Sequence, residues 1–450
     1  MKPFPARITF LVFLSAPLLG LRADDSAPAP NQVEITADFI DSLVVEAQGQ
    51  NPALRAAAAR TEAATAAVAS VRTWDDPTAS FGLWAPTSRG FQSSEEGNLI
   101  YGLDQRLPLF GRPDLKRKVA AANASREQLA AEYETQKLRL DIQIALNGLA
   151  TAGREAEIAK QDLAWLDATL ASVDHRYRVG QASQVDWLKI QTARAMAADG
   201  LETKEKERDH GVFALNRLLN RDLHTPWPRV AIPSIGPPIY YTAALVAAAL
   251  AAEPQLRVMR QESASAQAAA DLTRRQRLPD VNVGIEARQY SGDGGLREGT
   301  ATVSFSVPWL NRGKYDNDWR RDQQRKRASD LEAEDQALSI REKLHHRVVD
   351  LDTARRQAAL NQDQLIPLTR QTLDSAQAAW EHNLGSFQDI LDAHRMLLAN
   401  ELALDHALTD QNMIFAEISF LTGSRDMGTL VALAGDPPSD HDGHSPDNSK

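Results

Sequence analysis

The chain of 450 residues contains no cysteine. Disulfide bonds are therefore excluded, and no thiol near the N-terminus can carry a lipid anchor. Beyond the N-terminal region the sequence also lacks any uninterrupted apolar run of about 18 residues, so it predicts no transmembrane helix. Basic residues are not in excess either: 50 lysines and arginines against 60 acidic residues give a net charge of −10, which argues against a nucleic-acid partner.

The N-terminus has the parts of a secretory signal peptide. Lys2 and Arg7 precede an apolar run over residues 8–21, and Ala23 offers a small residue for cleavage. We therefore expect residues 1–23 to be removed on export and residues 24–35, which are rich in Pro and Ala, to form a linker. The rest of the chain would then function outside the cytoplasm.

Two stretches of the sequence match each other at a constant spacing. An aromatic residue, a Gly or Asn, a Ser and an Asp recur 203 positions apart, with long helical sequence on both sides. Gly and Asn readily take the left-handed conformation that ends a helix, and Ser is a favoured N-cap for the next one. Each stretch therefore predicts a turn between two helices in a duplicated chain. The matched pairs are Tyr177 and Trp380, Gly180 and Asn383, Ser183 and Ser386, and Asp186 and Asp389.

Each copy also predicts a β-hairpin. Strands are expected at about 77–87 and 98–108 in the first copy, and at about 279–290 and 299–308 in the second. After Pro279 the alternation places Val281, Val283 and Ile285 on one face and small or polar residues on the other. Such strands suit a membrane β-barrel with lipid outside, and they suit equally a hairpin packed on a soluble core. Four strands are too few to close a barrel, so a barrel would need several chains.

Helical sequence fills most of the remainder. After each hairpin, apolar residues recur three and four positions apart, which is typical of helices that pack as coiled coils. That periodicity alone favours an ordinary coiled-coil domain. The expected units are a first repeat at 36–223, with a long helix at about 114–176 and a return helix at about 183–219; a Pro-rich linker at 224–238; a second repeat at 239–424, with a long helix at about 316–380 and a return helix at about 386–421; and a polar tail at 425–450.

This order of elements, repeated twice after a signal peptide, resembles the outer-membrane efflux protein family typified by TolC. The most specific matches are Tyr177-x-x-Gly180 with Ser183 and Asp186, and the continuous stretch 386–393, SFQDILDA. The resemblance implies a mainly α fold with a small β part. In it, a duplicated unit of helix, β-hairpin and long helix forms a trimeric α-barrel and a 12-stranded transmembrane β-barrel, with four strands from each chain.

The resemblance also implies a function. The protein would be the passive exit duct of a tripartite efflux system in the outer membrane of a Gram-negative bacterium, extending into the periplasm. Small toxic compounds or metal ions would reach it from an inner-membrane pump of the RND type through a periplasmic adaptor. Outer-membrane lipid would surround the barrel, and no catalysis, cofactor or nucleic acid is implied. Export of a protein or peptide, or a soluble periplasmic coiled-coil adaptor, remain alternatives.

The resemblance places the pore gate on Asp389 and Asp392, one helical turn apart. In a trimer each would form a ring of carboxylates that attracts cations, and neighbouring like charges would raise each other's pKa. Asp186, Trp380 and Tyr177 take the places of contacts that hold the tip closed. The alternative for the aspartates is a solvated carboxylate in the first turn of a helix, stabilised by the helix dipole.

The residues at the two turns, Gly180, Ser183, Asn383, Gly385 and Ser386, would dock the adaptor. The sequence departs from the best-known members of the family at one point that matters for closing. Gly385 stands where those members have an Arg that helps to lock the tip, and Trp380, which can donate but not accept a hydrogen bond, stands in place of a Tyr. The contacts that close this pore must therefore differ.

The tail carries the only metal-binding candidates. His441 and His444 lie among aspartates, and imidazole with carboxylate could hold a transition metal weakly. The chain is also similar in general appearance to the heavy-metal-efflux branch of the family. A disordered polar tail is the alternative, and we prefer it, so no metal site is predicted.

Overall fold

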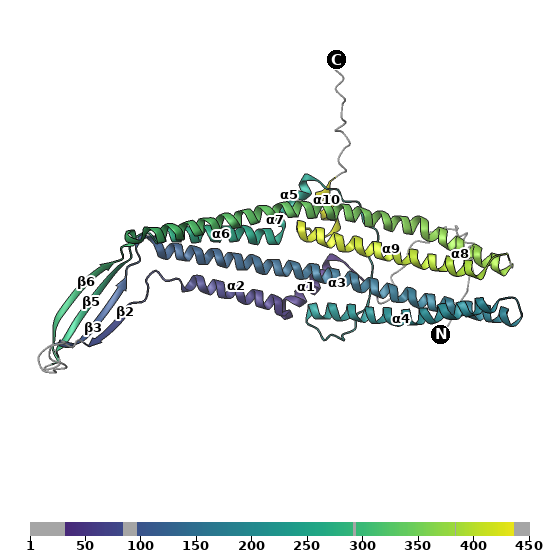
Figure 1. Ribbon diagram of the computed structural model, residues 1–450, viewed down its shortest axis with the longest axis horizontal. Helices are drawn as coiled ribbons and strands as arrows, with labels where there is room; N and C mark the ends of the chain where they lie inside the picture. The colour runs from purple at the N-terminus through teal and green to yellow at the C-terminus, as the bar shows by residue number, and fades with distance from the viewer. Residues whose placement is uncertain (1–31, 84–96, 291–293, 383, 436–450) are drawn as a thin grey trace, which may run out of the picture.

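The computed structural model describes residues 32–83, 97–290, 294–382 and 384–435. The molecule is elongated, with a small sheet at one end, long helices side by side through the middle and two helical turns at the other end (Figure 1). The predicted signal peptide, Asn383 and the two tail histidines lie outside the described residues.

Both repeats contribute the same series of elements. The first contains α1 (Ala37–Gln50), α2 (Pro52–Ser70), β2 (Thr78–Leu83), β3 (Gly97–Arg106), α3 (Arg112–Arg178) and α4 (Gln184–Leu219). The second contains α5 (Ala243–Ala252), α6 (Pro254–Arg275), β5 (Val281–Tyr290), β6 (Leu296–Phe305), α7 (Arg312–Leu360), α8 (Ile366–Glu381) and α9 (Phe387–Thr422). Short 3₁₀ turns, η1 (Leu109–Gly111) and η2 (Pro308–Asn311), join each hairpin to its long helix. Within the described residues, no helix has both the length and the apolar character needed to cross a membrane.

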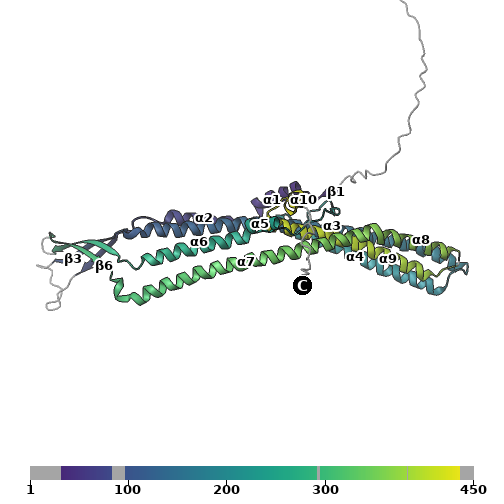
Figure 2. The same ribbon diagram turned by 90° about the horizontal axis from the view of Figure 1, so that it is seen from above.

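The helices form a wall with two distinct edges. α3 packs against α2 and α4 on one side and against α6 and α9 on the other, and α7 packs against α6 and α9. The helices α2 and α4 therefore lie along one edge, and α7 and α8 along the other (Figure 1). Seen from above, α1 and a short C-terminal helix, α10 (Met427–Ala434), stand on the same side of the wall (Figure 2).

The four long strands form one antiparallel sheet in the order β2-β3-β5-β6. The register pairs Phe81 with Tyr101, Leu103 with Ile285, and Val283 with Val303. Because residues opposite each other on neighbouring strands share a face, these apolar side chains form one continuous face. The opposite face is mainly polar and includes Glu286 paired with Thr300. In a single chain the sheet is open, with β2 and β6 as its edges.

Both predicted linkers need correction. Strand β1 (Gln32–Glu34) lies in the stretch 24–35 and pairs in parallel with β4 (Arg229–Ala231), which lies in the stretch 224–238. Val230 of β4 is buried in the core of the first repeat with Leu146 and Leu215. Strands of three residues are too short to show an alternation, which is why the sequence did not reveal them.

The predicted polar tail also begins later than expected. α10 occupies the stretch after residue 425, and its Leu430 and Ala434 are buried in the core of the second repeat. Asp426 starts this helix, since its carboxylate accepts the N–H of Thr429 at 2.7 Å.

The second long helix, predicted at about 316–380 with Pro367 as its only strong break, is interrupted close to that proline. A π-helical turn, η3 (Asn361–Leu365), separates α7 from α8. Pro367 follows directly, and proline both lacks an N–H and clashes with the carbonyl four residues earlier in a regular α-helix. A π turn adds a residue at such a break and is often found at functional sites.

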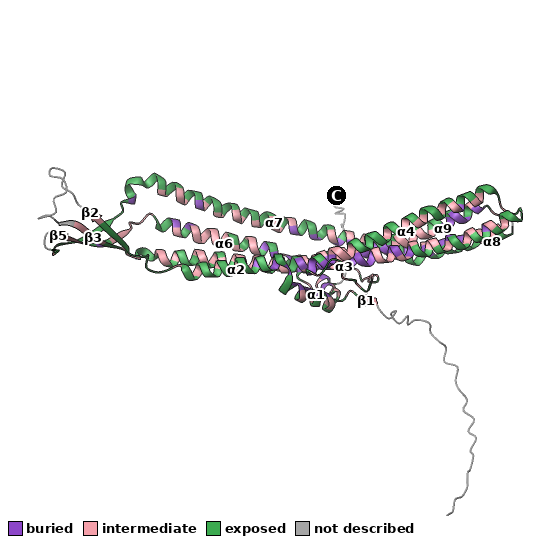
Figure 3. Ribbon diagram, turned by 90° about the horizontal axis from the view of Figure 1, so that it is seen from below, coloured by how far each residue is buried: buried purple, intermediate pink, exposed green. Residues whose placement is uncertain are grey.

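Buried residues are concentrated in the middle of the molecule and towards the helical turns, whereas α7 near the sheet is largely exposed (Figure 3). Each repeat has its own core in the middle of the molecule. A third cluster lies near the turns and joins the two repeats; it contains Leu166, Val173, Ile190, Leu373, Phe387, Ile390 and Leu391.

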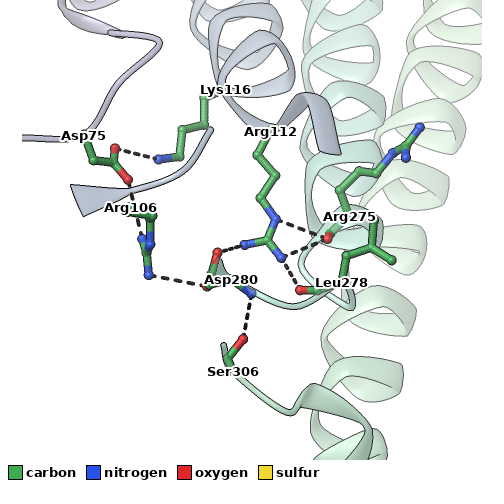
Figure 4. A network of polar contacts seen from close by, with 8 residues as sticks. All are labelled: Asp75, Arg106, Arg112, Lys116, Arg275, Leu278, Asp280 and Ser306. Atoms are coloured by element: carbon green, nitrogen blue, oxygen red, sulfur yellow. Dashed lines mark hydrogen bonds and ion pairs between the residues drawn. The ribbon is translucent and has the colours of Figure 1, made fainter. Parts of the chain in front are cut away.

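A network of polar contacts holds the two repeats together where the strands meet the helices (Figure 4). Arg112, the first residue of α3, pairs with the carboxylate of Asp280 and donates to the carbonyl oxygens of Leu278 and Arg275. Asp280 also accepts from Arg106 of β3 at 3.3 Å. The start of α3 is thereby tied to the connection between α6 and β5.

Candidate functional site

The first turn connects α3 to α4 by a tight reversal. The N–H of Gly180 donates to Tyr177 O at 3.0 Å, and that of Gln181 donates to Arg176 O at 2.7 Å. Gly180 has a φ of 75°, in the left-handed region that a residue with a Cβ adopts only at a cost. This position therefore depends on glycine for its backbone conformation.

The second turn connects α8 to α9 and depends on glycine for a different reason. The N–H groups of Leu384 and Gly385 both donate to Ala379 O, at 2.8 and 3.2 Å. A Cβ at position 385 would lie 3.0 Å from the Cβ of Ala379. A side chain at this position would therefore crowd the end of α8 unless Ala379 moved.

Both return helices begin with a reciprocal capping box. Asp389 N donates to Ser386 Oγ at 3.2 Å, and Ser386 N donates to Asp389 Oδ2 at 3.0 Å. In the first repeat, Ser183 N and Oγ both donate to Asp186 Oδ2, at 3.2 and 2.7 Å. The hydrogen bond from the Ser386 backbone, followed by that from its side chain, lowers the pKa of Asp389. Each carboxylate thus stabilises the start of its own helix.

Asp392, one turn further along α9, is 57% exposed and is held differently. Gln388 Nε2 donates to both carboxylate oxygens, at 2.9 and 3.0 Å, and Arg395 Nη1 lies 3.5 Å away. Lys189 Nζ, which occupies the position in the first repeat equivalent to Asp392, donates to Gln388 Oε1 at 2.7 Å. Gln388 therefore connects the two return helices beside this carboxylate.

The aromatic residues of the turns have different partners in the two repeats. The Tyr177 ring stacks near Trp187, with centroids 6.1 Å apart, and Trp187 Nε1 donates to Asp174 Oδ1 at 3.2 Å. Trp380 instead lies 5.6 Å from the Phe387 ring, with the guanidinium carbon of Arg176 4.0 Å from its centroid. Arg176 was not singled out from the sequence. Its position directly before Tyr177 was the only available signal.

His394 lies deeper along α9 and was not singled out from the sequence. Its Nε2 lies 2.7 Å from Asp162 Oδ1 of α3, and its ring stacks on Trp165 with centroids 3.6 Å apart. The residue is buried, and its Nδ1 has no hydrogen-bond partner within the described part of the chain. This contact fixes the orientation of α9 against α3 immediately behind the two aspartates.

No group of three or more His, Cys, Asp or Glu residues that could hold a metal ion occurs among the residues that the structure describes. The tail candidates His441 and His444 fall outside those residues. The arrangement of the tip is therefore one of exposed carboxylates on helix ends, supported by contacts between the two repeats.

Two repeats of helix, hairpin and long helix, with capped turns at one end and a sheet at the other, define the fold of an outer-membrane channel. The sequence profile described as "Outer membrane efflux protein" matches residues 43–221 and 245–424. The chain belongs to this family, and the resemblance noted from the turns is confirmed. It is therefore a protein of the outer membrane that extends into the periplasm, and its family is one of efflux channels.

Solved structures share this fold. The outer-membrane channel OprN is 20% identical, with a TM-score of 0.74 over 86% of this chain and 90% of its own. VceC from Vibrio cholerae is 16% identical, with a TM-score of 0.72 over 86% and 96%. The open state of MtrE from Neisseria gonorrhoeae is 16% identical, with a TM-score of 0.69 over 86% and 90%. No curated protein sequence matches the chain.

Proposed function

We propose that the protein is the passive exit duct of a tripartite efflux system. Three copies form a 12-stranded transmembrane β-barrel continued by an α-helical tube, with four strands from each copy. The duct passes small toxic compounds or metal ions that an inner-membrane RND pump hands over through a periplasmic adaptor. It carries out no catalysis and holds no cofactor, because the work is done by the pump.

The continuous apolar face of the sheet carries this proposal. Ile285 on β5 is 60% exposed, and Val303 and Phe305 on the neighbouring strand β6 are 69% and 60% exposed. An apolar face of this kind, backed by a polar face, is what a strand needs between lipid and a water-filled lumen. In water it would be an aggregation hazard, so the lipid of the outer membrane is its natural partner.

The two edges of the helical wall support closure into a ring. On α7 and α8, exposed apolar residues recur at helical spacing: Leu331, Leu338, Val349, Leu360 and Leu368. On α4, at the opposite edge, Val185, Leu188 and Met196 are exposed in the same way. Contact between unlike edges is a head-to-tail association, which closes into a ring when the rotation allows it. The number of copies is three because the proposed barrel has 12 strands and each copy supplies four of them.

The turns are suited to docking an adaptor. Leu384 is 84% exposed and Val179 is 54% exposed, so each turn presents an apolar side chain beside the capped helix start. Gly180, Ser183, Gly385 and Ser386 belong to this docking surface, and Asn383, which lies outside the described residues, is predicted to belong to it. In the same tip, Asp389 and Asp392 form the gate, with Asp186, Tyr177 and Trp380 as contacts of the closed state.

The proposal is tested by charge placed on either face of the sheet. Ile285→Lys puts a cation on the proposed lipid face, at a cost of about 2–4 kcal/mol per chain near the bilayer centre, and should abolish the detergent-stable trimer and its conductance in planar bilayers. Thr300→Lys, on the polar face, should leave the trimer intact and change only conductance. The proposed duct is contradicted if both variants form the trimer equally well, or if the wild-type protein is monomeric in detergent.

A further inference from the structure

A pocket of about 470 Å³ lies in the middle of the molecule, away from the sheet and from the turns. Its walls come from α1, α3, the junction of α5 with α6, and the end of α9. α3, which contributes lining residues within 135–143, packs between the two edges of the helical wall. The volume is in the range of pockets that take small organic ligands.

The charge of the pocket is predominantly positive. Its lining includes Arg139, Arg257 and Arg425, with Asp41 as the only carboxylate. Arg139 pairs with Asp41, and Arg257 pairs at 3.0 Å with Glu132, which is not part of the lining. Arg425 has no ion pair within the described part of the chain. One guanidinium therefore remains available to a ligand, and a second is balanced from outside the pocket.

Arg425 also lies close enough to Arg139 for their charges to interact. Burial of Arg139, and then the neighbouring Arg425 guanidinium, lower the pKa of Arg139. Two like charges in one partly buried pocket repel each other, and an anion between them would relieve this repulsion.

Ser419 is a second polar residue of the pocket whose side chain lacks a partner within the described residues. This residue lines the pocket and is only 8% exposed, and its Oγ is buried with no hydrogen-bond partner in the described residues. By contrast, the buried hydroxyl of Thr422 on the same helix has a partner, since its Oγ1 donates to Ile418 O at 2.9 Å. A buried hydroxyl without a partner costs about 1–3 kcal/mol, which a ligand oxygen at this position would offset.

We propose that this pocket binds a small organic anion through a carboxylate or phosphate group. Arg425 and Arg139 pair with its oxygens, because a guanidinium offers two parallel donors that match both groups. Ser419 Oγ donates a further hydrogen bond, and Val44 and Phe420 of the lining contact the apolar part of the ligand. The inference does not depend on conduction through the tube, because the site lies on α3 and not in the gate.

The site can be tested by calorimetry on the full-length protein in detergent, with citrate and inorganic phosphate as probes at constant ionic strength set by chloride. We expect saturable binding of at least one probe, and the tighter of the two identifies the preferred group. Arg425→Gln should weaken binding at least tenfold. Arg341→Gln, which removes an exposed arginine on α7, should leave it unchanged.

Ser419→Ala distinguishes a ligand contact from a structural role. It should weaken binding about threefold or more while raising the thermal midpoint of the ligand-free protein, because an unsatisfied hydroxyl is removed. The proposal is overturned if neither probe binds, if Arg425→Gln binds like the wild type, or if Arg341→Gln causes an equal loss. A Ser419→Ala variant with unchanged affinity removes this residue from the site and contradicts the proposed geometry.

Discussion

Arg176, near the end of α3, places its guanidinium carbon 4.0 Å from the centre of the Trp380 ring near the end of α8. The contact joins the first repeat to the second at the level of the turns. A cation over an indole face is attracted by about 0.5–1 kcal/mol at exposed sites and more when desolvated. It offers an interaction across the tip in a chain where a Cβ at position 385 would lie 3.0 Å from the Cβ of Ala379.

If this contact holds the tip closed, Arg176→Met should raise the open probability of single channels in planar bilayers by about twofold to fivefold, the equivalent of about 0.5–1 kcal/mol. Trp380→Phe should have a smaller effect, because the phenyl ring keeps a weaker face for the cation. Arg178→Met is the matched control, since Arg178 is 76% exposed and pairs within its own helix with Asp174. If Arg176→Met and Arg178→Met raised the open probability equally, the loss of positive charge would be the cause and not the contact with Trp380.

The two aspartates of α9 should determine ion selectivity. Replacing both Asp389 and Asp392 with Asn keeps the shape and removes two charges from each copy. The cation-to-anion permeability ratio, measured from reversal potentials in a salt gradient, should fall by about fivefold or more, which corresponds to about 1 kcal/mol. Asp374→Asn, an exposed position on α8, should leave the ratio unchanged. If the double variant were as cation-selective as the wild type, the two aspartates would not control selectivity, and their role would be limited to stabilising the start of α9.

The capping box gives Asp389 a defined pH dependence. Its pKa is lowered in the folded chain, because the Ser386 N–H stabilises the carboxylate. Its stabilising contribution is therefore complete above the unfolded value of about 4 and is lost as the pH falls through the lower folded value. The thermal midpoint of the wild type should exceed that of Asp389→Ala by a constant amount from pH 7 to pH 5, and the difference should shrink as the pH falls below about 4.

The same measurement separates capping from repulsion between copies. The rings expected from the sequence would raise the pKa of Asp389, the opposite of the direction found within one chain. Under repulsion, the difference between wild type and variant would begin to change between pH 7 and pH 5. The pH dependence of the difference in thermal midpoint therefore shows whether capping or repulsion between copies has the larger effect on Asp389 in the assembled tip.

The junction of strands and helices should depend on arginine at position 112. Arg112 is 15% exposed and reaches Asp280 and two carbonyl oxygens from separate nitrogens of its planar guanidinium, whereas the three donors of a lysine lie on one nitrogen and cannot match that arrangement. Arg112→Lys should lower the free energy of unfolding by about 1.5–3 kcal/mol, measured by denaturant titration in detergent. Arg320→Lys, an exposed position on α7, should change it by less than about 0.5 kcal/mol.

Local patterns account for what the sequence predicted well. Ser183 and Asp186 are three residues apart, and the capping box needs only that spacing. The alternation around Val283 and Ile285 likewise specifies a strand with two unlike faces, and the register extends that face across the sheet. The membership of the family was predictable because the two turns repeat such local patterns at one spacing.

Contacts between distant segments were not predictable in the same way. His394 pairs with Asp162 across 232 positions, and that pairing depends on how α9 is rotated against α3. Arg176 reaches Trp380 for the same reason. The pocket on α3 requires five elements to meet, and neither Arg425 nor Ser419 belongs to a recognisable motif.

The pairing of β1 with β4 also has a consequence for folding. Gln32 lies opposite Arg229, so the first strand of the described chain has no partner until nearly two hundred further residues have followed it. Closing so large a loop is entropically costly and slow compared with forming local helices. The helices of the first repeat can therefore assemble early, while β1 is fixed only once the segment between the repeats has reached the core.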